Sequence, residues 1–142
     1  MRAAALVVLL ALTAGCAPRT HTVPPYRDDA DQGAALAARA AAMCAAHAPL
    51  PPQPFVTDGC SSWPDSTWVS CCVAHDADYW CGGSPAERLE SDRALRACVS
   101  EDSGAFWGTL MYWGVRAGGG PRLPFPWRWG YGWPYRARVP GQ

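Results

Sequence analysis

The chain has 142 residues, a formal net charge of zero and seven cysteines. This length allows one domain with a thin hydrophobic core once an N-terminal segment is removed. Because the sequence contains no basic helix and no basic repeat, nothing in it supports nucleic-acid binding.

The first fifteen residues have the features of an export signal. Arg2 supplies a positive charge, and the apolar run from Ala3 to Ala14 is interrupted only by Thr13. About a dozen residues are too few to span ~30 Å of hydrocarbon as a helix, but they suit a signal-peptide core. Small residues followed by Cys16 resemble the bacterial lipobox. We therefore predict that residues 1–15 are a lipoprotein signal peptide and that Cys16 is lipidated.

A lipidated Cys16 would anchor the exported chain to the bacterial envelope. In a host with two membranes, the residue after the cysteine, Ala17, favours the periplasmic face of the outer membrane. The alternative is an ordinary cleaved signal peptide followed by an incidental cysteine.

The region after the signal is predicted to contain a tether and then a helix. Residues 16–30 form the tether, and the Ala-rich stretch from Asp31 to Ala48 has high helix propensity, with Asp31 as its N-cap. Prolines between positions 49 and 54 break this helix. Gly, Pro, Asp and Ser residues in 57–67 predict a loop.

Two central helices and one further helix are predicted after the loop. The first runs from near Thr67 to Cys81 and ends at two glycines. The second begins with the capping sequence Ser84-Pro85-Ala86-Glu87 and continues to about Val99. A further helix spans Ala105 to Val115. We therefore predict a small all-α, disulfide-stapled domain at residues 31–117, with two antiparallel central helices, flanking helices and an irregular aromatic tail at 118–142.

Six cysteines besides Cys16 predict a disulfide framework. An even set of cysteines in a small exported domain is typical of such a framework. The six residues are Cys44, Cys60, Cys71, Cys72, Cys81 and Cys98. A zinc site is the competing interpretation, with Cys71, Cys72, His75 and Asp76 as ligands. Adjacent cysteines point to different sides of a helix and fit a tetrahedral site poorly, so the framework is favoured.

The two central helices carry matching apolar stripes with polar residues inside them. The stripe of the earlier helix comprises Trp68, Cys72, His75 and Tyr79, and that of the later helix comprises Leu89, Asp92, Leu95 and Val99. A buried carboxylate needs a partner, and His75 and Tyr79 both lie where they could reach Asp92. In an antiparallel pair of helices, the numbers of facing residues have a nearly constant sum. The pairs His75–Asp92 and Cys71–Cys98 differ in this sum by two residues, which is about 3 Å along the helix axis. One arrangement therefore allows both contacts.

This constellation predicts a hydrolytic site. A histidine held by a buried aspartate is suited to act as a general base. If Cys60 bonds to Cys72, the loop carboxylate of Asp58 and the carbonyl of Gly59 would lie beside Asp76, forming an oxygen-rich pocket suited to Ca²⁺. Such an ion would polarise a carbonyl group. The alternative is that His75 is a hydrogen-bonded core histidine and the loop carboxylates are only solvated.

Three segments resemble the secreted phospholipase A2 superfamily, most closely its bacterial and fungal branch. The segment Cys71-Cys72-Val73-Ala74-His75-Asp76, with Tyr79 following, resembles the active-site helix of that superfamily. Ser91-Asp92-Arg93-Ala94 through Cys98 resembles its second catalytic helix, and Thr57 to Asp65 is similar to its calcium loop. The resemblance covers residues 57–99.

The resemblance implies a role for each residue of the site. His75 would deprotonate the water that attacks the sn-2 ester of a glycerophospholipid, Asp92 would orient His75, and Tyr79 would assist. Asp76, Asp58 and the Gly59 carbonyl would hold calcium. It also implies the bridges Cys60–Cys72 and Cys71–Cys98, which leaves Cys44 and Cys81 as the remaining pair.

The C-terminal region is rich in aromatic residues and arginines. Residues 103–142 contain five arginines and no acidic residue. The aromatics are Phe106, Trp107, Tyr112, Trp113, Phe125, Trp127, Trp129, Tyr131, Trp133 and Tyr135. Contact with a phospholipid surface is one hypothesis, since Trp and Tyr favour the bilayer interface and Arg pairs with phosphate. The other is that the aromatics fill the core, which is favoured for Trp107 and Trp113 and stays open for residues 126–135.

Two alternatives to a phospholipase remain open. One is a non-catalytic envelope lipoprotein that uses the same fold as a binding or structural module. The other is a periplasmic protein that binds an unknown protein partner through the aromatic tail.

Overall fold

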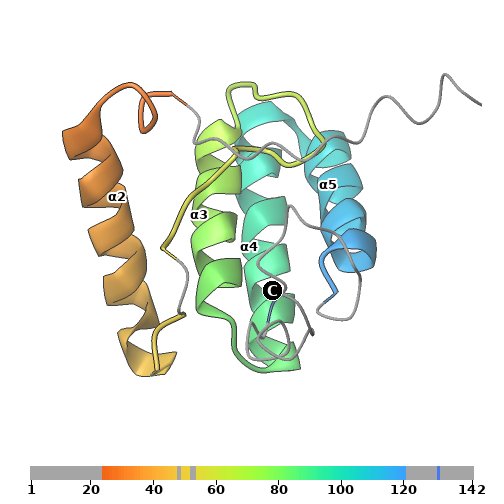
Figure 1. Ribbon diagram of the computed structural model, residues 1–142. Coiled ribbons are helices and arrows are strands. Elements are labelled where there is room, and N and C mark those ends of the chain that lie inside the picture. The colour runs from red at the N-terminus through yellow and green to blue at the C-terminus, as the bar shows by residue number, and fades with distance from the viewer. Residues whose placement is uncertain (1–23, 48, 52–53, 121–130, 132–142) are drawn as a thin grey trace, which may run out of the picture.

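The protein is built from helices. The computed structural model describes residues 24–47, 49–51, 54–120 and 131, and these contain helices and no strand. The order is α2 (Ala30–Met43), a 3-10 helix η1 (Cys44–His47), α3 (Val69–Cys81), α4 (Pro85–Ser103) and α5 (Ala105–Gly118). The α-helices lie side by side in chain order, and α3 and α4 are antiparallel (Figure 1). The predicted small all-α class is confirmed.

The predictions for the two ends of the chain mostly concern residues that the structure does not describe. The signal peptide at 1–15, Cys16 and residues 17–23 of the tether lie outside the described residues, as does most of the tail at 118–142. Among the described helices, none has the length and apolar character needed to cross a membrane.

The first helix begins earlier than predicted. Asp29 has an extended backbone, and its carboxylate accepts hydrogen bonds from the N–H groups of Asp31 (3.0 Å) and Gln32 (3.1 Å). The prediction that Asp31 is the N-cap is therefore wrong, because Asp31 already lies in the first helical turn. The α-helix also stops at Met43, and only a 3-10 turn continues to His47 before the prolines.

The two central helices begin and end near their predicted signals, except that α4 runs four residues past the predicted end at Val99, to Ser103. α3 ends at Cys81, and the next residue, Gly82, has φ +73°, a conformation that favours glycine. The capping box predicted for α4 is present: Ser84 Oγ accepts from Glu87 N (3.2 Å), and Glu87 Oε2 accepts from Ser84 N (2.7 Å). The short connection between the helices makes their antiparallel packing possible.

Buried side chains form two clusters on either side of α3. One cluster lies among α3, α4, α5 and the preceding loop and comprises Cys60, Trp68, Cys71, Cys72, Leu95, Val99 and Met111. The other lies mainly between α2 and α3 and comprises Ala40, Cys44, Phe55, Ala77, Trp80 and Cys81. Both clusters contain cystine sulfur, which is consistent with a small domain that needs covalent crosslinks.

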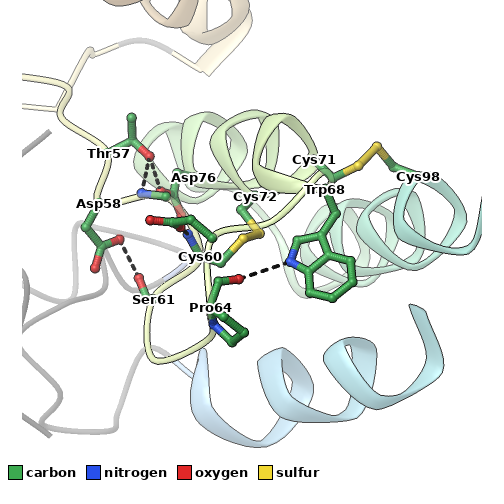
Figure 2. The surroundings of a disulfide bond; sticks show 12 residues. Thr57, Asp58, Cys60, Ser61, Pro64, Trp68, Cys71, Cys72, Asp76 and Cys98 are labelled. Atoms are coloured by element: carbon green, nitrogen blue, oxygen red, sulfur yellow. Dashed lines mark hydrogen bonds between the residues drawn. A yellow bond between two sulfur atoms is a disulfide. The ribbon is translucent and has the colours of Figure 1, made fainter. Parts of the chain in front are cut away.

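The six cysteines form three disulfides, Cys44–Cys81, Cys60–Cys72 and Cys71–Cys98. These are the three expected pairs. Figure 2 shows how the latter two fix α3, one fastening the loop before it and the other joining it to α4. The competing zinc site fails, because both of its thiol ligands are bonded to other cysteines.

α5 packs closely on α4 and presents aromatic side chains to solvent. A Cβ at Gly108 would collide with Ser100 Oγ and lie 2.5 Å from the Arg96 carbonyl oxygen, so the two helices meet where glycine permits it. The prediction that Trp113 fills the core is wrong, since its side chain is 63% exposed while Met111 occupies the buried face. The same prediction is wrong for Trp107, which is 38% exposed although the centroid of its ring lies 5.5 Å from that of Trp68.

Candidate active site

The antiparallel pairing of α3 and α4 brings His75 and Asp92 into contact. His75 Nε2 lies 2.9 Å from Asp92 Oδ1, and both side chains are buried. Tyr79, one turn after His75, donates its hydroxyl to the same carboxylate oxygen at 2.7 Å. The Cys71–Cys98 bridge joins the same two helices. The structure therefore contains both contacts that the helix register allowed.

Asp92 is fully buried, and its contacts keep it ionised. Burial alone would raise the pKa of Asp92, but hydrogen bonds from His75, Arg116 and Tyr79 outweigh this effect and lower it below the ordinary value of 3.8. An ionised carboxylate can only accept hydrogen bonds. In the neutral imidazole, Nε2 of His75 therefore carries the hydrogen, and Nδ1 is the nitrogen with a free lone pair.

Two arginines that the sequence analysis did not assign to the site surround Asp92. Arg116 Nη1 donates to Asp92 Oδ2 at 2.6 Å. Arg88 Nε donates to the Tyr79 hydroxyl at 3.0 Å and lies 3.8 Å from Asp92 Oδ2. The sequence alone could have indicated Arg88, because residues four positions apart on a helix lie on the same face and their side chains can contact each other. No local pattern links Arg116 to a carboxylate 24 residues away.

Tyr79 is held as a neutral hydrogen-bond donor. Burial, together with the negative charge of Asp92, raises the pKa of Tyr79 well above its ordinary value. The ring of Tyr131 packs edge-on against that of Tyr79, with centroids 5.1 Å apart, and Tyr131 is itself buried. At this position, one aromatic residue of the predicted tail therefore packs against the site.

The loop before α3 gathers acidic and hydroxyl groups next to His75. Thr57 Oγ1 donates to Asp76 Oδ2 at 2.6 Å and accepts from Gly59 N at 3.1 Å, while Ser61 Oγ donates to Asp58 Oδ1 at 2.6 Å (Figure 2). Burial raises the pKa of Asp76 well above its ordinary value despite the Thr57 hydrogen bond, and the charges of Asp58 and Asp65 add to this shift. Asp76 thus lies in a crowded anionic environment.

The donor chemistry of this loop suits a hard cation more than a soft one. Asp76, Asp58 and Gly59, the three predicted calcium ligands, all lie in or beside the loop and offer oxygen atoms. Within the described ranges, no three His, Cys, Asp or Glu side chains gather closely enough to hold a metal ion. A cation here would therefore draw further ligands from carbonyl, hydroxyl or water oxygens, which calcium accepts in its six to eight positions.

A cavity of about 190 Å³ opens beside His75 and Asp76. Its apolar walls are formed by Trp63, Leu95, Met111 and Val115, and backbone atoms of several glycines complete the lining. Because Nε2 is engaged with Asp92, Nδ1 is the ring nitrogen left for a molecule in the cavity. The arrangement places a base next to space that suits an apolar chain.

Comparisons of the chain with models of known protein families, with curated proteins and with solved structures each found no match.

Proposed function

We propose that this chain is a calcium-dependent hydrolase of the sn-2 ester of glycerophospholipids, similar to secreted phospholipase A2. The observation that carries the proposal is the buried His75–Asp92 pair, 2.9 Å apart, beside a cavity with apolar walls. A general base next to an apolar cavity suits a substrate that combines a reactive ester with a long hydrocarbon chain.

In this mechanism, His75 acts as the general base. Nδ1 accepts a proton from a water molecule while the water oxygen attacks the sn-2 carbonyl carbon. Asp92 stabilises the imidazolium through the Nε2–H hydrogen bond, and Tyr79 holds the accepting oxygen in place. When the ester C–O bond breaks, the imidazolium returns the proton to the leaving alkoxide. The products are a fatty acid and a lysophospholipid.

Calcium would be held by the carboxylates of Asp76 and Asp58 and by the carbonyl of Gly59. A bound calcium ion would polarise the ester carbonyl and stabilise negative charge on its oxygen. The mutual repulsion of the loop carboxylates supports a cation at this position, since the ion would replace an unfavourable contact with a favourable one.

The first test is fatty-acid release from phospholipid vesicles, measured against calcium concentration. We expect release with calcium and none with a chelator. Asp76→Asn should weaken calcium activation by roughly 10–100-fold, because it removes a ligand charge. Glu90→Gln, which changes a carboxylate whose side chain is 81% exposed on α4, is the matched control and should behave as the native protein. Release that is equal in chelator would contradict the calcium role, and no release from any common phospholipid would support the non-catalytic alternative.

The exposed side of α5 supports contact with a phospholipid surface. Phe106 is 70% exposed, Trp113 is 63% exposed, and Leu110 between them is 40% exposed. Their spacing places them on one helical face. Other residues of α5, among them Met111 and Val115, line the cavity. We therefore propose that the exposed side of α5 contacts the membrane, while the side that lines the cavity contacts the acyl chain of the substrate. We also propose that lipidation of Cys16 keeps the protein at the envelope.

A second test measures partition of the protein into vesicles. Phe106→Ser and Trp113→Ser are each expected to weaken vesicle binding about tenfold, because each removes apolar area that the bilayer would bury. Their folding stability should change little, since both side chains are exposed. Met43→Ser, at an exposed apolar residue of α2, is the control and should bind normally. Unchanged binding by both α5 variants would contradict this surface.

A further inference from the structure

We infer that Arg116 is a positioning residue that fixes the orientation of the Asp92 carboxylate and thereby selects the tautomer of His75. This inference deepens the proposed function. The kinetic part of its test rests on that function, whereas the NMR part does not. It begins from the division of contacts between the two carboxylate oxygens: Oδ1 accepts from His75 and Tyr79, whereas Oδ2 accepts from Arg116.

This division prevents rotation of the carboxylate. A turn about the Cβ–Cγ bond would move Oδ1 away from His75 and, at the same time, Oδ2 away from Arg116. Asp92 is 0% exposed, so water does not compete for either oxygen. The contact with Arg116 is short, at 2.6 Å, and links opposite charges. It is therefore suited to hold the carboxylate in a single orientation.

Arg116 comes from a separate helix, and that helix end is itself fixed to the site. Arg88 Nη2 donates to the carbonyl oxygens of Val115 (2.9 Å) and Arg116 (3.0 Å), in the last turn of α5. A Cβ at Gly119 would lie only 2.6 Å from the Tyr79 hydroxyl, so the chain passes directly over the site. These contacts place the Arg116 guanidinium against Oδ2 although it lies far from Asp92 in sequence.

Among the described groups, only Arg116 donates a hydrogen bond to Oδ2. The charged or titratable neighbours of Asp92 are His75 and Tyr79 on α3, Arg88 on α4, Arg116 on α5, and Tyr131. His75 and Tyr79 are bonded to Oδ1, and Arg88 Nε is 3.8 Å from Oδ2 while it binds Tyr79. Removing the Arg116 guanidinium would therefore leave Oδ2 buried without a hydrogen bond and allow the carboxylate to turn.

Such a turn would change the chemistry at His75. When Oδ1 no longer accepts from Nε2, the hydrogen bond that fixes the hydrogen on Nε2 is lost, and the other tautomer becomes accessible. The other tautomer carries its hydrogen on Nδ1, which then cannot accept a proton from water. Loss of the Arg116 charge should therefore lower kcat without changing contacts along the apolar walls of the cavity.

The test combines imidazole nitrogen NMR with kinetics on the full chain. The variants are Arg116→Met, which removes the charge, Arg116→Lys, which keeps it, and Arg93→Met, a control whose side chain is 63% exposed on α4. The His75 signals are assigned by their loss in His75→Gln. We expect the Nε2–H tautomer in the native, Lys and control proteins, and the Nδ1–H tautomer to appear in Arg116→Met. We expect kcat to fall about 10²-fold in Arg116→Met with KM unchanged, and to recover to within about tenfold in Arg116→Lys.

Two outcomes would overturn the inference. One is a native tautomer in Arg116→Met, and the other is a loss of activity in Arg116→Lys as large as that in Arg116→Met. If Arg116→Met does not fold, as judged by near-ultraviolet circular dichroism, Arg116→Gln replaces it as the neutral variant. If the native protein hydrolyses no phospholipid, the NMR result still decides the role of Arg116, so failure of the two proposals can be told apart.

Discussion

His75→Gln is expected to lower the rate of phospholipid hydrolysis by about 10²–10⁴-fold, the usual contribution of a general base. The Gln amide nitrogen can still donate a hydrogen bond to Asp92, so the buried carboxylate need not lose this partner. The side chain has no nitrogen that can take a proton from water at neutral pH, however. The initial rate of fatty-acid release at saturating calcium measures the effect, with circular dichroism as the check on folding.

Tyr79→Phe separates the role of the imidazole from that of the hydrogen bonds around Asp92. That variant loses one donor to Asp92 but keeps the His75 contact at 2.9 Å, so its rate should fall by only about tenfold. A His75→Gln protein that keeps more than about a tenth of the native rate would show that another group is the base. Equal losses in the two variants would indicate that the buried network as a whole, not the imidazole, controls the rate.

The helix boundaries that were predicted best have local causes. Ser84 and Glu87 form a capping box whose partners are three residues apart, so the sequence alone identifies the start of α4. The start of α2 was missed although its cap is also local. Asp28, Asp29 and Asp31 are all acceptable N-caps by residue type, and only the backbone conformation shows that Asp29 is the cap.

The His75–Asp92 contact could be predicted because it follows from the register of two helices with a short connection. The connection makes them antiparallel, and the positions of Cys71 and Cys98 are compatible with the same alignment. Arg116 could not be predicted in this way. Its approach to Asp92 depends on the packing angle of α5, which close contact at Gly108 permits and which no periodic pattern encodes.

The exposure of Trp113 has a similar explanation. Because the domain is small and its core is thin, we expected tryptophan to be buried. The helix places Met111 in the core, and Trp113, two residues later, therefore lies on a different side of α5. Which side is buried depends on tertiary packing, so residue type did not decide it.

The adjacent cysteines show how so small a domain can support a site. Cys71 is bonded to α4 and Cys72 to the preceding loop, so one turn of α3 is covalently joined to both neighbours. His75 and Asp76 follow one turn later, the former contacting α4 and the latter the loop. The two disulfides thus hold α4 close to His75 and the loop close to Asp76. A thin core alone would hold these segments less firmly.

Asp92→Asn is expected to lower the free energy of unfolding at pH 7 by about 3 kcal/mol. This is the lower end of the cost of breaking a buried ion pair, because 27% of the Arg116 side chain is exposed and water can partly solvate it. The Asn amide nitrogen is a donor, so in one orientation it faces Arg116, which can only donate, and in the other it faces His75 and Tyr79 and displaces their hydrogen bonds to the carboxylate. Urea denaturation of both proteins measures the difference.

The pH dependence of this difference distinguishes lost charge from lost packing. The pKa of Asp92 is lower in the folded protein than its ordinary value of 3.8, so its ionised form stabilises the fold above about that pH. This contribution is lost as the pH falls through the lower, folded pKa. The native protein should therefore approach the stability of Asp92→Asn in acid, and the gap should be largest near neutral pH. A gap that is constant with pH would mean that shape, not charge, accounts for it. A double-mutant cycle with Arg116→Met would then show no coupling between the two residues, whereas a charge effect requires such coupling.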